Sequence, residues 1–179
     1  MNMQSISGPK IMGILNVTPD SFSDGGSFSN IETAVDHALR MVEEGADIID
    51  IGGESTRPGA KRVAAAEQIN RVIPVIRTLM EKIPDSVSLS IDTTLAEVAE
   101  AAIHSGVSMV NDISAGREDN SIFQLVAKHN AFIVLMHMQG MPETMQLNPN
   151  YNDVVKEIRC FFIESISHAE SAGVNPGQI

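Results

Sequence analysis

Five short, mainly apolar segments, each with Asn, Asp or His next to its end, constrain the fold of this chain more than any other feature. They lie at residues 11–15, 47–51, 87–91, 107–110 and 132–136. Short apolar runs bounded by turn residues are typical of parallel strands buried on both faces. Segments with helical spacing of apolar residues stand between them, and one more follows the last. This strict alternation predicts βαβ units, hence a parallel sheet covered by helices.

Local signals mark where several of these helices should begin and end. Ser29 with Glu32, and Thr94 with Glu97, have the spacing of capping boxes. Pro74 lies inside the helical pattern of residues 64–83, where it predicts a kink or a later start. A turn is expected at residues 175–177, and a sixth strand would be starting at Ile179.

The number of strands bears on the choice between a barrel and an open sheet. A (β/α)₈ barrel needs eight strands and at least about 200 residues, whereas this chain has 179 residues. An open doubly wound sheet is the alternative, but it concentrates its ligand at one switch point. Here polar residues end all five strands. This favours the barrel, because its site draws on the carboxyl ends of most strands. We therefore expect one α/β domain over residues 1–179, holding about the first five units of a (β/α)₈ TIM barrel and apparently truncated before the sixth strand.

Composition excludes several kinds of partner and site. A net charge of −11, aromatic residues at 4% and no Trp argue against nucleic acid and anionic membranes. No apolar run approaches the length of a membrane span. The single cysteine, Cys160, excludes an internal disulfide and indicates a reducing, cytoplasmic location. Cys160 lies among phenylalanines in a helical pattern, so we expect it in the core.

Asn16 ends the first strand. An amide oxygen can bind a hard cation such as Mg²⁺, and an amide nitrogen can donate to a phosphate. The alternative is a turn residue bonded to its own loop backbone.

Asp50, Asp92, Asn111 and Asp112 end the next three strands. A carboxylate accepts two parallel hydrogen bonds, so it suits an amino-pyrimidine edge, and an Asn beside it can donate as well. The alternative is that Asp92 or Asp112 caps the following helix, which is the stronger expectation for Asp112.

The remaining polar candidates are less specific. Arg57, beside Thr56 and Pro58, suits a carboxylate or phosphate, although a solvated loop Arg is an equal alternative. His137 follows the fifth strand between two methionines and is more often a structural residue than a base. The other histidines fall on helices or helix ends and are expected at the surface: His37, His104, His129 and His168.

Two longer motifs make a family resemblance visible. Residues 13–26 (GILNVTPDSFSDGG) and 52–59 (GGESTRPG) resemble the two signature loops of dihydropteroate synthases. Residues 90–93, 111–113 and 135–140 match further segments of that family in the right order. The resemblance implies a (β/α)₈ barrel that joins 4-aminobenzoate to (7,8-dihydropterin-6-yl)methyl diphosphate, giving 7,8-dihydropteroate and pyrophosphate with Mg²⁺. It also implies that the full-length family form is a homodimer.

The resemblance assigns roles to residues of this chain. Asn16 would contact Mg²⁺ and diphosphate, and Thr56 would touch the diphosphate substrate. The pterin would lie against Asp92 and Asn111, with Asp50 nearby and apolar walls at Ile113 and Met136. Asp24 could stabilise a developing cation. The resemblance implies mobile loops that contain Phe22, Ser23, Asp24, Arg57 and Pro58. It also makes Asp24, Thr56 and Arg57 the catalytic candidates.

The chain also departs from the family pattern. The segments that supply an Asp and a Lys for the pterin and a basic cluster for the diphosphate would follow Ile179. Only Arg57, Lys61 and Arg62 are cations near the motif loops. We therefore expect little or no synthase activity from the 179 residues alone. Two other functions stay open: a pterin-binding methyltransferase of the methyltetrahydrofolate:corrinoid type, and a non-catalytic pterin-binding remnant.

Overall fold

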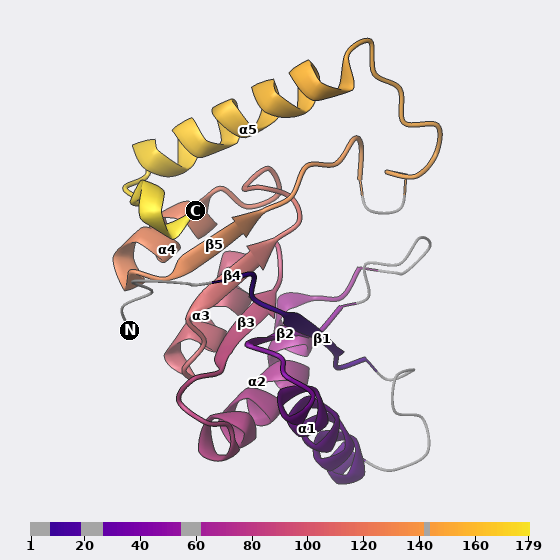
Figure 1. Ribbon diagram of the computed structural model, residues 1–179, viewed down its shortest axis with the longest axis vertical. Coiled ribbons are helices and arrows are strands. Elements are labelled where there is room, and N and C mark those ends of the chain that lie inside the picture. Colours follow the sequence, from indigo (N-terminus) through magenta and orange to yellow (C-terminus); the bar gives the residue numbers. More distant parts are fainter. Residues whose placement is uncertain (1–7, 19–26, 55–61, 142–143) are drawn as a thin grey trace.

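Strands and helices alternate along the chain as the sequence predicts (Figure 1). The computed structural model describes residues 8–18, 27–54, 62–141 and 144–179. They form a single parallel sheet with the strands in sequence order. The strands are β1 (Met12–Asn16), β2 (Ile48–Gly52), β3 (Ser88–Asp92), β4 (Met109–Asp112) and β5 (Phe132–Leu135).

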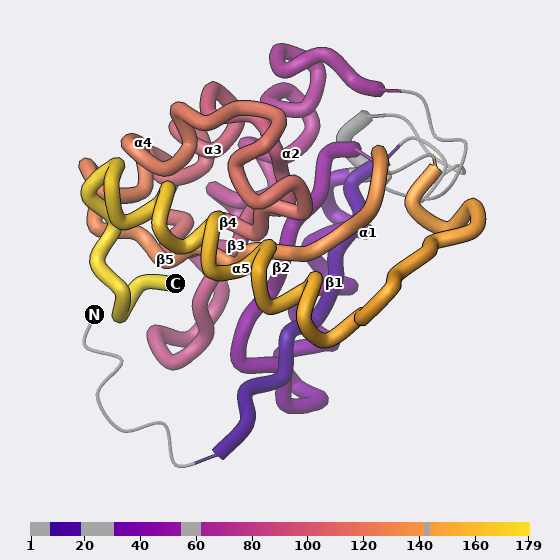
Figure 2. The backbone as a smooth tube through the Cα atoms, turned by 90° about the horizontal axis from the view of Figure 1, so that it is seen from above, coloured from indigo at the N-terminus to yellow at the C-terminus, as the bar shows by residue number. Residues whose placement is uncertain are grey.

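Five helices follow the strands, and a short 3-10 helix ends the chain. Helices α2, α3 and α4 lie side by side along one face of the sheet (Figure 2), and α5 lies next to α4 at the β5 end (Figure 1). In the described ranges no helix has both the length and the apolar character to cross a bilayer. The helices are α1 (Ser27–Glu43), α2 (Ala65–Lys82), α3 (Ala96–His104), α4 (Ser121–His129), α5 (Val154–Ser171) and the 3-10 helix η2 (Pro176–Gln178).

The order β1 to β5 has no reversal, so it lacks the switch point of a doubly wound sheet. Each strand pairs in parallel with the next strand in the sequence, as in the wall of a (β/α)₈ barrel. The expected five barrel units are confirmed, and the doubly wound alternative is wrong.

The outer face of the sheet holds the core. Successive strand residues point to opposite faces, so residues in register on parallel strands share a face. One outward row is at most 2% exposed and packs beneath the helices. Burying each of these side chains is worth about 1.5–3 kcal/mol, which makes this row a main source of stability. The row consists of Leu15, Ile51, Ile91, Val110 and Ile133.

The inner face is polar at its centre and open at its edges. Ile14 on β1 is 64% exposed and Val134 on β5 is 39% exposed, so apolar side chains at both edges reach solvent. Between them, the residues in register at the carboxyl ends of the strands are Asn16, Gly52, Asp92 and Asn111.

Both predicted capping boxes are wrong. Helix α1 begins at Ser27, so Ser29 lies inside it. Helix α3 begins at Ala96, after Leu95, which makes no side-chain cap. The Ala96 amide instead donates to Asp119 Oδ2 at 2.9 Å. A carboxylate brought in by the fold therefore replaces the local cap expected from Thr94.

Two further expectations about helices need correction. Helix α2 begins at Ala65 and continues through Pro74, so the later start is wrong. Cys160 is exposed rather than in the core. The reason is the packing of α5, which buries only Ser165 and Ala169 fully. Asp153 caps this helix by accepting from the Lys156 amide at 3.0 Å.

The end of the chain is tied to the sheet. Gln178 donates from Nε2 to the Ala131 carbonyl, just before β5, at 2.6 Å. Asn175 and Gln178 form a capping box around η2, which confirms the predicted turn. The described chain ends there, so the expected sixth strand stays a prediction.

Candidate functional site

Four polar side chains predicted as a site come from four neighbouring strands. Asn16, Asp92 and Asn111 stand at the carboxyl ends of β1, β3 and β4 at one level of the register. Asp50 lies two residues deeper on β2, on the same face, and is 3% exposed. Because parallel strands present their carboxyl ends at one edge, distant segments of the chain meet here.

Gly52 leaves a gap in the middle of this row. A Cβ at this position would lie 3.4 Å from Asn16 Oδ1 and 3.5 Å from Asp92 Oδ2. The two oxygens therefore flank one point that no side chain occupies. A carboxylate and an amide oxygen around one space make a donor set suited to a hard cation such as Mg²⁺.

Asp50 and Asn111 form a buried polar pair. Asn111 donates from Nδ2 to Asp50 Oδ2 at 2.8 Å. The other oxygen, Asp50 Oδ1, is buried without a hydrogen-bond partner, and so is the Ser90 hydroxyl. Burial raises the pKa of Asp50. The Asn111 amide and the Ser90 hydroxyl, which is paired in register with Asp50 but lacks the geometry of a hydrogen bond, oppose that rise. An orphaned buried oxygen is costly, so Asp50 Oδ1 is suited to a ligand donor.

Asp92 is the most perturbed acid of the row. Burial raises the pKa of Asp92 to about 7, and repulsion from Asp50, Glu54 and Asp112 adds to the effect. Desolvation and clustered like charges commonly coincide at functional sites. Near neutral pH this carboxyl group can therefore either donate or accept a hydrogen bond.

Asp112 has a structural role, but the expectation that it caps the following helix is wrong, because α4 begins at Ser121 after Asn120. It is fully buried and accepts from the backbone amides of Ser114 at 2.8 Å and Gly116 at 2.6 Å. Gly116 has φ +74°, a backbone conformation that favours glycine. Asp112 thus closes the β4–α4 turn rather than starting the helix. Burial raises its pKa, and these hydrogen bonds and Arg117 oppose the rise.

Apolar residues predicted as walls lie beside the row. Ile113 is 8% exposed, and Met136 is half-buried just after β5. His137 makes an edge-to-face contact with Phe161 of α5, with ring centroids 4.8 Å apart. The contact supports a structural role for this histidine, as expected.

An ion and hydrogen-bond network that the sequence did not reveal joins Glu54, just after β2, to residues before and within α2. Glu54 accepts from Gln68 Nε2 at 2.8 Å and from the Val63 amide at 3.1 Å, and pairs with Arg62 at 3.1 Å. Arg62 also pairs with Glu118. Gly53 must lack a side chain, because a Cβ there would lie 3.1 Å from the backbone of Gln68. The network joins partners from separate loops and helices, so local spacing gives no signal for it.

The described cations near the strand ends are already engaged. Arg62 is bound by two glutamates, Arg71 donates to the Gly53 carbonyl at 2.9 Å, and Arg117 donates to the Ser114 and Met138 carbonyls. Arg117 also lies 5.1 Å from the centroid of the Phe161 ring. Within the described ranges, the row at the strand ends is therefore dominated by acids and amides.

Several predicted site residues lie outside the described residues. This applies to both motif loops, so their predicted roles stay predictions. The residues are Phe22, Ser23, Asp24, Thr56, Arg57, Pro58 and Lys61.

A separate hollow of about 890 Å³ lies between the β4–α4 loop and α5, lined by Arg117, Phe123 and Phe161 among others. None of the polar row at the strand ends lines it. The row is thus a surface of the inner face rather than part of this hollow.

Comparisons with known proteins agree with the fold and the motifs. The chain is 49% identical to a dihydropteroate synthase of Synechocystis sp. over 169 residues, covering 94% of this chain and 58% of that protein. For the Escherichia coli dihydropteroate synthase the identity is 46%, covering 94% and 59%. This chain thus spans about 60% of the length of these relatives.

Solved structures show the same architecture. A Clostridium difficile dihydropteroate synthase determined in the presence of pteroic acid superposes with a TM-score of 0.86 at 47% identity, covering 95% of this chain and 62% of that one. A Xanthomonas albilineans dihydropteroate synthase with 4-aminobenzoic acid gives a TM-score of 0.86 at 47% identity, covering 96% and 60%. The family model described as "pterin binding enzyme" matches residues 12–179. The chain belongs to the pterin binding enzyme family.

Proposed function

We propose that the strand-end row binds a dihydropterin and serves a dihydropteroate synthase reaction. The observation that carries the proposal is the set of Asp50, Asp92 and Asn111 on one face, with Asp50 Oδ1 buried and unpartnered. The amino-pyrimidine edge of a pterin offers an exocyclic NH₂ beside a ring N–H, which a carboxylate accepts as a pair. Asn111 adds an amide that can both donate and accept.

The proposed chemistry follows from the two substrates. The amine of 4-aminobenzoate forms a bond to the methylene carbon of the dihydropterin while the bond from that carbon to the diphosphate oxygen breaks. The aniline nitrogen loses a proton and pyrophosphate leaves. The reduced pterin delocalises the positive charge that develops on the methylene carbon, so no strong base is needed. The protein's task is to orient the rings, stabilise the leaving diphosphate and exclude water.

We propose Asn16 as the residue that would hold Mg²⁺, with Asp92 left to the pterin. The Asn16 amide oxygen, beside the Gly52 gap at the end of β1, fits a hard cation. When bound, Mg²⁺ supplies positive charge that stabilises the leaving diphosphate. In this proposal Asp24, Thr56 and Arg57 complete the site from the two motif loops.

We further propose that the 179 residues alone turn over slowly. Arg62, one of the three cations near the motif loops, is bound by Glu54 and Glu118. Arg71 and Arg117 are also engaged with protein groups. A dianionic or trianionic leaving group would need further cations beyond those described here. A cytoplasmic location, which the single free Cys160 favours, and a homodimer of the longer form, which rests on the family resemblance, belong to the same proposal.

The alternative methyltransferase does not bind a diphosphate. In this chain, Asn16 and the Thr56–Arg57 loop resemble the dihydropteroate synthase segments that would contact one. Structures of similar proteins were determined in the presence of pteroic acid or with 4-aminobenzoic acid, which supports the same choice.

Pyrophosphate release from the two substrates tests the proposal. It should be measured on this chain and on a chain extended at its C-terminus to the length of the relatives. We expect turnover by the extended chain, abolished by Asp92→Ala, and little by the 179 residues. Pterin binding without pyrophosphate release in the extended chain would favour the non-catalytic remnant, and full turnover by the short chain would contradict the proposed need for more cations.

A further inference from the structure

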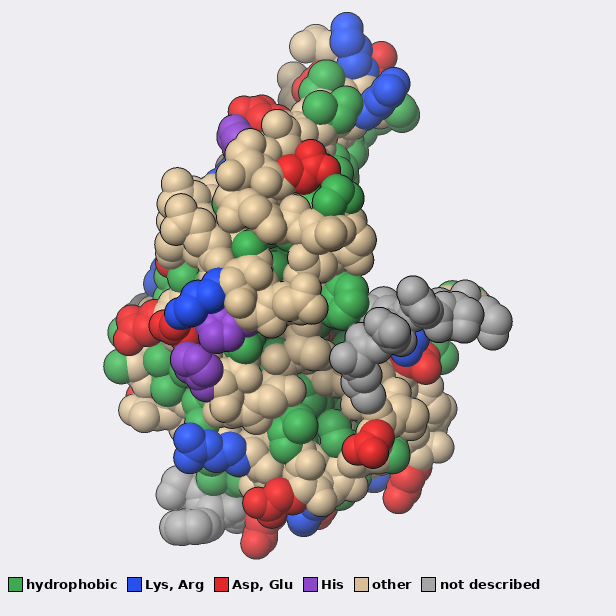
Figure 3. All heavy atoms as spheres, turned by 90° about the vertical axis from the view of Figure 1, so that its left-hand side faces the viewer, with side chains coloured by type: hydrophobic (Ala, Val, Ile, Leu, Met, Phe, Trp, Pro, Cys, Tyr) green, Lys and Arg blue, Asp and Glu red, His purple; other side chains and the backbone are tan. Residues whose placement is uncertain are grey.

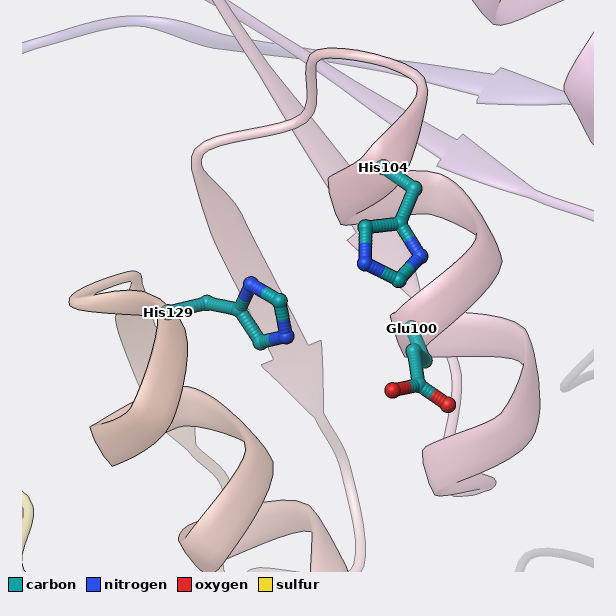
Figure 4. Close-up of side chains that lie close together, drawn as sticks. All are labelled: Glu100, His104 and His129. Atoms are coloured by element: carbon teal, nitrogen blue, oxygen red, sulfur yellow. The ribbon is translucent and has the colours of Figure 1, made fainter.

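A second group of metal-ligating side chains lies at the opposite end of the molecule from the strand-end row. Glu100 and His104 project from α3 and His129 projects from α4 into the same gap (Figure 4). One ligand atom from each lies within 4.8 Å of the others. Since each helix runs back from the carboxyl end of one strand to the start of the next, the ends of α3 and α4 are remote from the row.

The three groups lie near the surface: His104 is exposed, and Glu100 and His129 are half-buried. Glu100 and His104 are one helical turn apart, so they share a face of α3. The rings of His104 and His129 meet edge to face, with centroids 5.1 Å apart. Histidine side chains are adjacent on the molecular surface, beside basic and acidic groups (Figure 3). An ion could therefore approach the group from the side of the exposed His104.

One nitrogen of the cluster lacks a hydrogen-bond partner. His129 Nε2 is buried and has no hydrogen-bond partner. With the ring proton on Nδ1, Nε2 presents a lone pair that nothing in the described structure uses. A buried polar atom without a partner is costly, and a metal ion is one group that would satisfy it.

The local field favours a cation. His104 and His129 are the last residues of α3 and α4, so two helix C-termini converge at the cluster. The carbonyl ends of helices attract positive charge. The net charge of −11 adds a long-range attraction for cations.

We propose that Glu100, His104 and His129 form a binding site for a divalent transition metal ion of the zinc class. Two imidazoles and a carboxylate are a ligand set for Zn²⁺, Co²⁺ or Ni²⁺ rather than for Mg²⁺. Tetrahedral zinc brings its ligand atoms to about 3.4 Å of one another, given metal–ligand bonds of about 2.0–2.1 Å. Small rotations of the exposed His104 and of Glu100 close that difference, and water completes the coordination. The ion would tie α3 to α4.

Lys128 supplies an internal competitor. Its Nζ lies 3.6 Å from Glu100 Oε1 at the edge of the cluster. A bound metal ion would share Glu100 with this ammonium group or displace it. Removing the lysine charge should therefore strengthen metal binding, an effect that no purely structural role of the histidines would produce.

Metal titration tests the site. The chain should carry Cys160→Ser to remove the exposed thiol, and excess Mg²⁺ should saturate oxygen sites at the strand ends. Zn²⁺ binding is measured by calorimetry, and Co²⁺ binding by its visible absorption, which reports nitrogen ligation. We expect one saturable ion, with affinity reduced at least about tenfold by His104→Ala or by His129→Asn, because even outer-shell partners of a metal are worth about 10–100-fold. Glu100→Gln should weaken binding and Lys128→Met should strengthen it.

Matched controls exist on the same scaffold. His37→Ala removes an exposed histidine from α1, and Glu97→Gln removes the same charge one turn earlier on α3. Both should bind the ion like the parent. His104 is exposed, so its variant should fold, and circular dichroism checks each protein. Absence of saturable binding, or equal affinity in the His104→Ala and His37→Ala variants, would overturn the proposal.

Discussion

The two faces of strand β3 differ in burial and in polarity. On β3, Ile91 points to the outer face and is fully buried under helices, whereas its neighbours Ser90 and Asp92 point to the inner face. The outer row is apolar in all five strands. The inner row has an orphaned oxygen, an orphaned hydroxyl and an acid with a raised pKa. Stability therefore resides mainly on the outer face, and the inner face gives up stability for chemistry.

The largest expected effect is on the outer face. Ile91→Ala leaves a cavity beneath the helices and should lower the free energy of unfolding by about 3–4 kcal/mol. Urea unfolding followed by circular dichroism measures it. The milder Ile91→Val should cost about 1 kcal/mol. A loss below 1 kcal/mol for the alanine variant would show that the outer row is not the core.

On the inner face of the same strand, a substitution should raise the free energy of unfolding rather than lower it. Burial raises the pKa of Asp92 in the folded state to about 7, above its ordinary value of 3.8. The folded state thus holds the proton more tightly, so stability present below pH 4 is lost as the pH rises through 7. Asp92→Asn removes that loss and should stabilise the protein by about 2–4 kcal/mol at pH 8.

The same variant should bring almost no gain near pH 4, where the carboxyl group is protonated in the folded state. Thermal unfolding at both pH values decides the matter. If the effect of Asp92→Asn on stability were the same at both pH values, burial would not raise the pKa of Asp92.

Glu54, just after β2, is held by an ion and hydrogen-bond network rather than by apolar packing. Glu54→Gln should cost about 1–2 kcal/mol, since Glu54 accepts hydrogen bonds from Gln68 and Val63 and pairs with Arg62. Glu67→Gln is the matched control, because Glu67 is exposed and forms only a surface pair with Arg71. Equal losses in the two variants would contradict the anchoring role of Glu54.

The smallest effect is expected next to the largest one. Ser90 Oγ is buried without a partner, so Ser90→Ala removes an unsatisfied group and should change the free energy of unfolding by less than about 1 kcal/mol. Urea unfolding compares it with Ile91→Ala. A loss as large as that of Ile91→Ala would mean that the hydroxyl makes a bond that matters to the fold.

The pattern of strands and helices could be predicted because it depends on residues close together in the sequence. Apolar periodicity and glycine stops placed all five units, and the strand-end polar residues identified Asn16, Asp50, Asp92 and Asn111 as neighbours. Their proximity follows from parallel topology alone.

What could not be predicted depends on contacts between distant segments. Asp119 caps α3 from 23 residues away, so the local signal at Thr94 misled. Cys160 looked like a core residue, but α5 packs through Ser165 and Ala169. His129 was expected at the surface, like His104, yet its Nε2 is buried. The Glu54–Arg62–Glu118 network likewise arises only when separate segments meet.

Binding of a dihydropterin as a function of pH tests most directly whether the inner row recognises an amino-pyrimidine. Isothermal titration with 6-hydroxymethyl-7,8-dihydropterin should be run on the parent chain, on Asp92→Asn and on Ile91→Val. We expect the affinity to be constant above pH 7 and to fall about tenfold per pH unit below it, because the carboxylate form accepts the paired hydrogen bonds. Asp92→Asn should weaken binding about 100-fold at pH 8, the cost of two charge-assisted hydrogen bonds, while Ile91→Val leaves it unchanged. Equal affinity in the parent and Asp92→Asn at pH 8 would contradict pterin recognition by this row.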